Sequence, residues 1–159
     1  KVTLLRIALI PLCVAFLLSG FWGLSAVVFI FLSLSDLADG YIARKYHQVS
    51  ELGKQLDPLA DKILIMTVLI GLTSLGKAEA APVMLICARE FIIASVRAGK
   101  VFAASTIAKW KTVSQIAAVI MLMLNLPFGG WVLWFAVLLS LISGGAYLWQ
   151  SRSKLKKLS

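Results

Sequence analysis

The chain has 159 residues, 60% of them hydrophobic, and a mean hydropathy of +0.94. This composition excludes an ordinary water-soluble domain and favours one polytopic membrane domain covering residues 1–159. The formal net charge is +9. The basic residues border apolar runs and no soluble module presents them, so we expect no nucleic-acid partner.

Long apolar runs alternate with short polar breaks from one end of the chain to the other. A helix needs roughly 20 apolar residues to cross a membrane, and these runs lack the alternation of strands. Arg6 and Pro11 interrupt the first run and no cleavage site of small residues follows it, so we expect a membrane span there and no signal peptide. The sequence therefore predicts an all-α integral membrane protein with six transmembrane helices, at about 3–20, 21–45, 53–76, 81–101, 105–126 and 129–151.

Basic residues fall unevenly on the two sides that six spans define. If both termini share one side, that side receives all of the 16 Lys and Arg residues except Lys77, which Glu79 offsets. The positive-inside rule then places the N- and C-termini in the cytoplasm. The basic C-terminal tail fits this topology, and it fits attraction to anionic membrane lipid equally well.

Acidic residues enter the second and third apolar runs, where a membrane helix should be uncharged. Asp36 and Asp39 are three residues apart, and Asp57 and Asp61 are four apart, so each pair shares one face of a helix. A short connection makes the two helices antiparallel neighbours, and both acidic faces can then meet. Clustered carboxylates repel one another, so either several are protonated or cations neutralise them. A ligand set of oxygen atoms alone favours Mg²⁺ or Mn²⁺.

Small residues accompany these aspartates. Gly40 and Ala43 continue the face of Asp36, and Gly53 lies one turn before Asp57. Bare backbone leaves room for a ligand, although small residues also allow close packing of membrane helices. We favour the ligand, because buried charges are costly without a use.

The start of the third helix has two interpretations. Pro58 suits a first helical turn with Asp57 as the N-cap residue. Alternatively, the helix starts at Gly53 and Pro58 kinks it.

A second group of charges occupies the fourth and fifth runs. Arg89 and Glu90 fall inside the fourth run, Arg97 follows two turns later, and Lys109 and Lys111 begin the fifth. These cations flank the same cytoplasmic opening as the aspartates, which indicates an acceptor that carries its own phosphate. The alternatives are an internal ion pair of Arg89 with Glu90, and lysines that only satisfy the positive-inside rule. We favour phosphate binding, because a charged Arg inside a membrane is costly and usually marks a functional site.

The run from Asp36 to Asp61 reads D-x2-D-G-x2-A-R-x8-G-x3-D-x3-D. It resembles the signature of the CDP-alcohol phosphatidyltransferase family, with every fixed position present. The resemblance implies six membrane helices, a homodimer, and two bound divalent ions, Mg²⁺ or Mn²⁺. It implies that the metal ligands are Asp36, Asp39, Asp57 and Asp61. It implies that Asp61 is also the catalytic general base, and that the CDP-lipid site is lined by Asp36, Gly40, Ala43, Arg44 and Gly53.

Residues 3–11, 56–62, 86–93 and 109–112 are similar to the bacterial phosphatidylglycerophosphate synthases of this family. That similarity implies transfer of a phosphatidyl group from CDP-diacylglycerol to sn-glycerol 3-phosphate, at the cytoplasmic face of the inner membrane. The acceptor phosphate would be bound by Arg89, Arg97, Lys109 and Lys111. Inositol phosphate, serine and phosphatidylglycerol are the alternative acceptors.

A cation transporter or channel is the rival class of function. It predicts acidic residues spread through the depth of the membrane. Here Asp36 to Asp61 crowd towards one side, and the other side has only Glu79 in a loop. The distribution therefore favours an enzyme.

Overall fold

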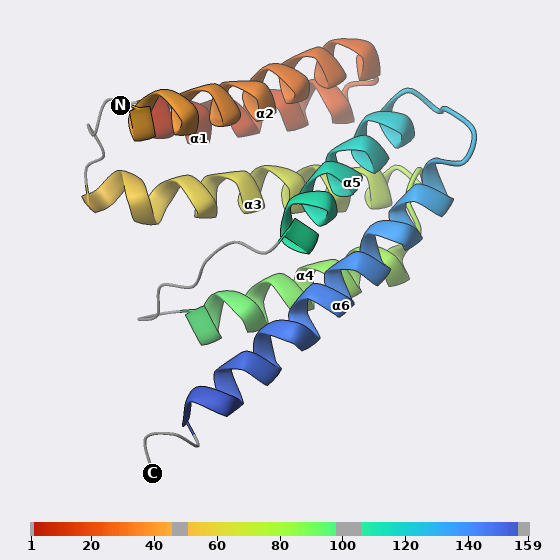
Figure 1. Cartoon of the computed structure of the whole chain (residues 1–159). Helices are drawn as coiled ribbons and strands as arrows, with labels where there is room; N and C mark the ends of the chain where they lie inside the picture. The colour runs from red at the N-terminus through yellow and green to blue at the C-terminus, as the bar shows by residue number, and fades with distance from the viewer. Residues whose placement is uncertain (1, 46–50, 98–105, 156–159) are drawn as a thin grey trace.

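The structure, a computed structural model, describes residues 2–45, 51–97 and 106–155, and the side chains within 7–35, 59–95 and 109–146. Over these residues the chain is entirely helical, as predicted, and forms six helices without a strand (Figure 1). They are α1 (Val2–Leu18), α2 (Trp22–Lys45), α3 (Glu51–Ser74), α4 (Ala80–Arg97), α5 (Thr106–Met123) and α6 (Gly129–Leu155).

The helices run alternately up and down, so the connections gather at the two ends of the molecule. The last turns of α2 and α4 and the first turns of α3 lie at one end, together with the start of α1 and the end of α6 (Figure 1). We call this the aspartate end, because α2 carries Asp36 and α3 carries Asp61 there. The connections 19–21, 75–79 and 124–128 lie at the opposite end.

Three helices terminate in the same manner at the opposite end. Gly20, Gly76 and Asn125 follow α1, α3 and α5 with φ angles of +84°, +68° and +53°. The residue after each donates its backbone N–H to a carbonyl five positions earlier, as Lys77 N does to Leu72 O at 2.9 Å. This is the Schellman cap, which needs a left-handed residue and therefore favours Gly or Asn. The caps satisfy carbonyl groups at each helix end and allow an immediate antiparallel return.

Apolar side chains and one polar link hold α1, α2 and α3 together. Leu17, Phe29 and Leu64 are fully buried in a shared core. Ser25 Oγ of α2 donates a hydrogen bond to the Cys13 carbonyl of α1 at 2.9 Å. Both residues are fully buried, so the bond satisfies a hydroxyl that would otherwise be costly to bury.

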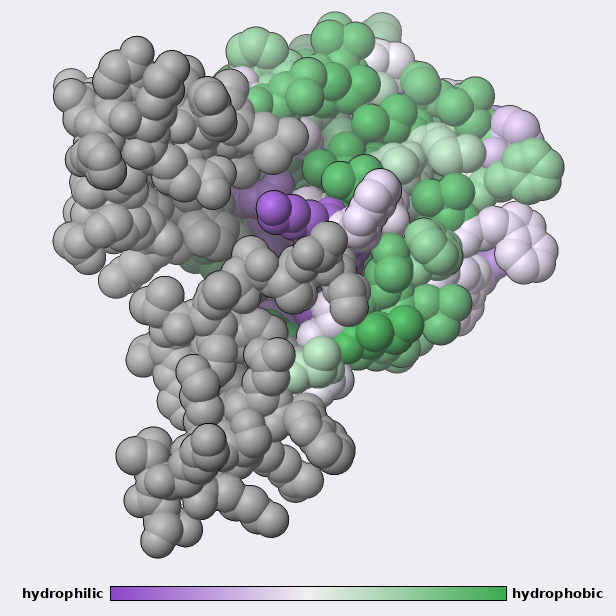
Figure 2. All heavy atoms as spheres, viewed as in Figure 1, coloured by the Kyte–Doolittle hydropathy of each residue, from purple (hydrophilic) through white to green (hydrophobic). Residues whose placement is uncertain are grey.

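Much of the described surface is apolar. Trp131, Phe91 and Val27 are among the large hydrophobic side chains that are well exposed. Figure 2 shows broad apolar areas, with a strongly hydrophilic patch in the middle of the view and paler polar groups at its right edge. Exposed apolar surface on this scale suits contact with lipid. Within the described residues one segment, 129–146 of α6, is long and apolar enough to span a membrane, and shorter apolar helices occupy 7–18 and 22–35.

The start of α3 settles one of the alternatives. The helix begins at Glu51, before Gly53, and continues through Pro58. The interpretation with Asp57 as an N-cap residue is therefore wrong. Proline has no backbone N–H, so the carbonyl four residues before it loses its helical hydrogen bond, and this loss is tolerated near the start of a helix.

Candidate active site

Two adjacent helices carry the four aspartates at the aspartate end. Asp36 and Asp39 lie in the last turns of α2, and Asp57 and Asp61 lie in the first half of α3. The two helices run antiparallel and contact each other, as predicted (Figure 1). Asp61 is half-buried. Several other side chains predicted for the site lie outside the described set, namely those of Asp36, Asp39, Gly40, Ala43, Arg44, Gly53, Asp57 and Arg97.

The donor chemistry of this site suits a hard divalent cation. Among the described side chains no three acidic, histidine or cysteine residues form a group that could hold a metal ion, and only Asp61 of the four aspartates belongs to that set. The full set offers carboxylate oxygens alone, with no His or Cys beside them in the sequence. Such ligands fit Mg²⁺ or Mn²⁺.

A buried carboxylate, Glu90 of α4, is the centre of a charged cluster that includes Lys62, the residue after Asp61 in α3. Its side chain is 4% exposed and contacts cations from three helices. Arg89 Nη1 lies 2.7 Å from Glu90 Oε1, and Lys111 Nζ of α5 donates to the same oxygen. Lys62 Nζ of α3 lies 3.3 Å from Glu90 Oε2. We call Lys62, Arg89, Glu90 and Lys111 the Glu90 cluster.

Arg89 extends the cluster to a fourth helix. Its Nε donates to the Ser140 carbonyl at 3.0 Å, and its Nη2 donates to Ser143 Oγ at 2.6 Å. Gly144 makes room for this arrangement, since a Cβ atom there would lie 3.1 Å from Arg89 Nε. The planar guanidinium is therefore oriented by α4 and α6 together.

The cluster contains more positive than negative charge. One carboxylate faces three cations, so the four side chains carry a formal charge of +2. The side chains of Lys111 and Arg89 are only 9% and 11% exposed. Excess buried charge is unfavourable unless an opposite charge joins it. The arrangement is therefore suited to receive an anion.

The predicted acceptor residues divide into two groups. Arg89 and Lys111 meet at Glu90, and the ion pair of Arg89 with Glu90, one of the open alternatives, is confirmed. Lys109 is exposed and takes no part in the cluster. Two residues correspond to about 200° around a helix, so Lys109 and Lys111 point in nearly opposite directions from α5.

Sequence reasoning assigned no role to Lys62 or to the serines of α6. Lys62 directly follows Asp61 inside a membrane helix, and this position was a usable signal. Ser140 and Ser143 are three residues apart in an otherwise apolar run, so they share a face. Neither pattern identifies the residue that these side chains contact, because that residue lies on another helix.

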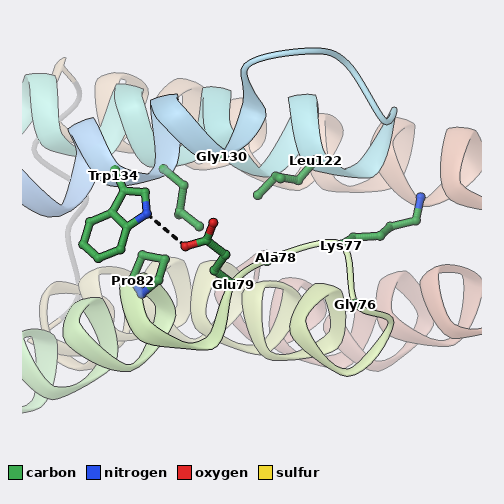
Figure 3. Close-up of a pocket in the computed structure, with 9 residues that line it drawn as sticks. Gly76, Lys77, Ala78, Glu79, Pro82, Leu122, Gly130 and Trp134 are labelled. Carbon is green, nitrogen blue, oxygen red and sulfur yellow. Dashed lines mark hydrogen bonds between the residues drawn. The ribbon is translucent and has the colours of Figure 1, made fainter.

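The opposite end of the molecule contains a cavity. It has a volume of about 380 Å³ and lies between the α3–α4 and α5–α6 connections. Trp134 Nε1 donates to Glu79 Oε2 across it at 3.1 Å, and Lys77 points away (Figure 3). Lys77 Nζ instead lies 3.1 Å from the centroid of the Trp22 ring and donates to Asn125 Oδ1, and partial burial lowers the pKa of Lys77. Glu79 and Lys77 already have these partners, so this cavity is the weaker candidate for the functional site.

An all-helical protein with paired aspartates and a buried cation cluster at one end is suited to process a phosphate-containing substrate. Residues 1–142 match the CDP-alcohol phosphatidyltransferase family, and the chain belongs to this family. The expectation from the aspartate signature is thereby confirmed.

The chain is similar to several enzymes named CDP-diacylglycerol–glycerol-3-phosphate 3-phosphatidyltransferase. It is 38% identical to the one from Bacillus subtilis, over 98% of this chain and 95% of that protein. It is also 38% identical to the one from Rickettsia bellii, over 78% of this chain and 76% of that protein. A chloroplastic or mitochondrial form from Arabidopsis thaliana is 32% identical, over 98% of this chain and 60% of its own length.

Proposed function

We propose that the chain transfers the phosphatidyl group of CDP-diacylglycerol to sn-glycerol 3-phosphate, giving phosphatidylglycerol phosphate and CMP. The observation that carries this proposal is the position of Lys62. It follows Asp61 directly in α3 and pairs with Glu90, so it joins the candidate base to the cations of the Glu90 cluster. The names of the similar bacterial and plant enzymes support the same donor and acceptor.

The proposed membrane arrangement has six spans, with both termini and the active site on the cytoplasmic side of the inner membrane and one domain over residues 1–159. The up-and-down order of the helices supports it, as does the exposed apolar surface. The charge bias supports its orientation, since Lys77 is the one basic residue assigned to the outer side. We also propose a homodimer, as the family resemblance implies.

The proposed metal ligands are Asp36, Asp39, Asp57 and Asp61. Two divalent ions, Mg²⁺ or Mn²⁺, would neutralise the diphosphate of the CDP-lipid and stabilise CMP as the leaving group. The proposed residues of the CDP-lipid site are Asp36, Gly40, Ala43, Arg44 and Gly53. Its depth near the membrane surface would leave the acyl chains in the bilayer and the nucleotide in water.

The proposed chemistry uses Asp61 as the general base. Its carboxylate accepts the proton of the acceptor hydroxyl while the hydroxyl oxygen forms a bond to the lipid-side phosphorus, and the bond from that phosphorus to the CMP oxygen breaks. Proton transfer to a positioned base contributes typically 10²–10⁴-fold to rate. Arg89 and Lys111, together with Arg97 and Lys109, are proposed to hold the acceptor phosphate.

An acceptor panel tests this function. The purified protein receives CDP-diacylglycerol with one acceptor at a time, and CMP release is measured. The acceptors are glycerol 3-phosphate, inositol phosphate, serine and phosphatidylglycerol. We expect rapid release with glycerol 3-phosphate. Release with another acceptor and none with glycerol 3-phosphate would overturn the assignment and leave a sibling activity in its place.

A further inference from the structure

We propose that Glu90 is a positioning residue that holds Lys62, Arg89 and Lys111 around one phosphate-binding point, and that Lys62 contacts the acceptor phosphate directly. The inference rests on the proposed function and adds two residues to it. It starts from geometry alone, because Glu90 contacts one cation on each of α3, α4 and α5.

The position of Glu90 suits a residue that holds the cations in place, and not one that binds the substrate. Its side chain is almost fully buried, and its negative charge would repel a phosphate. Without that charge, three cations would repel one another across a small volume. Glu90 therefore preorganises cations that would otherwise separate, and this function differs from direct binding.

Charge complementarity identifies the chemical class of the ligand. The Glu90 cluster has a formal charge of +2. A phosphate monoester carries about −1.5 to −2 charges near neutral pH, so one such group balances the cluster. In the described part of the molecule, Glu90 Oε2 has no hydrogen-bond partner although Lys62 Nζ is 3.3 Å away. Of the three contacts with Glu90, the one from Lys62 is therefore the longest and the only one without a hydrogen bond.

Lys62 is also the most accessible of the three cations. Its side chain is 24% exposed, against 9% for Lys111 and 11% for Arg89. An ammonium has three N–H donors, and the contact with Glu90 occupies at most one of them. Because Lys62 directly follows Asp61 on α3, a phosphate bound at Lys62 would lie on the same turn of the helix as the candidate base.

Steady-state kinetics with each substrate varied separately tests the inference. The variants are Glu90→Gln and Lys62→Gln, with Glu90→Asp as the conservative rescue. The matched control is Glu79→Gln, the same chemical change at the opposite end of the molecule. Loss of a charge-assisted contact predicts that the KM for glycerol 3-phosphate rises about tenfold or more in Glu90→Gln and Lys62→Gln. The KM for CDP-diacylglycerol should stay unchanged, and Glu90→Asp should recover part of the loss.

A merely structural role gives another pattern. Glu90→Gln would then lower the active fraction, and with it the apparent kcat, while leaving the KM for glycerol 3-phosphate unchanged. That result would overturn the proposal. If Glu90→Gln does not fold, Lys62→Gln decides, because Lys62 is partly exposed and an unchanged KM for glycerol 3-phosphate in this variant would equally contradict the proposal. Absence of CMP release by the wild-type protein with glycerol 3-phosphate would instead refute the proposed function itself.

Discussion

Lys62 Nζ lies 3.3 Å from Glu90 Oε2, and this contact connects the helix of Asp61 to the helix of Arg89. The two residues are far apart in the chain, and α3 and α4 come together through packing. The contact places the proposed proton acceptor and the cation cluster at the same end of the molecule.

Asp61→Asn should lower kcat by about 10²–10⁴-fold, because the amide cannot accept the hydroxyl proton. The substitution keeps the shape of the side chain, so helical content by circular dichroism should not change. CMP release is the measurement, and Glu79→Gln serves as a control with wild-type activity. Full turnover by Asp61→Asn would exclude this residue as the base.

Removal of divalent metal should abolish CMP release. Oxygen ligands release Mg²⁺ or Mn²⁺ to a strong chelator, and the diphosphate then loses its neutralising charge. Titration with each ion should restore activity and should be accompanied by a binding signal in calorimetry. The Asp57→Asn variant should lose much of that signal. Undiminished activity after exhaustive chelation would contradict the proposed ligand set.

Gly144→Ala should weaken the use of glycerol 3-phosphate, whereas Gly145→Ala should not. A Cβ atom at Gly144 would lie 3.1 Å from Arg89 Nε, but one at Gly145 would meet nothing within 4 Å. Both substitutions favour the helix by roughly 0.5–1 kcal/mol, so they form a matched pair. We expect a several-fold higher KM for glycerol 3-phosphate in Gly144→Ala alone. Equal kinetics in the pair would show that Arg89 adapts freely.

Cysteine labelling checks the proposed orientation. In a background without Cys13 and Cys87, Glu79→Cys and Lys109→Cys each introduce one thiol at an exposed position. A membrane-impermeant maleimide added to intact spheroplasts should label the first and spare the second, because Lys109 is assigned to the cytoplasm by the positive-inside rule. Labelling should be reversed in inside-out vesicles. The opposite pattern would invert the topology.

Ser25→Ala should lower the free energy of unfolding by about 1 kcal/mol, since it removes a buried hydrogen bond between α1 and α2. The bond runs from Ser25 Oγ to the Cys13 carbonyl at 2.9 Å. Ser19→Ala is the control, because Ser19 is exposed at the end of α1. Unfolding in detergent measures both. Indistinguishable stabilities would mean that a neighbouring group replaces the lost donor.

The helices were predictable because their signals are local. Apolar runs of membrane length end at Gly20, Gly76 and Asn125, and all three residues adopt the left-handed conformation that turns the chain back. The positions of Asp36 and Asp39 on one helix and of Asp57 and Asp61 on the next were predictable for the same reason. The start of α3 was not, because Asp57 followed by Pro58 is compatible with a first turn and with a helix interior.

Residue order is enough to predict that charged groups collect at one end of a helical bundle, since buried charge is costly and helix periodicity assigns residues to faces. Which of these charges meet depends on contacts between helices. Lys111 is buried against Glu90 while Lys109, two residues away, is exposed. That difference depends on how α5 is rotated against its neighbours, and the rotation is set by packing of the whole bundle, which no short stretch of sequence encodes.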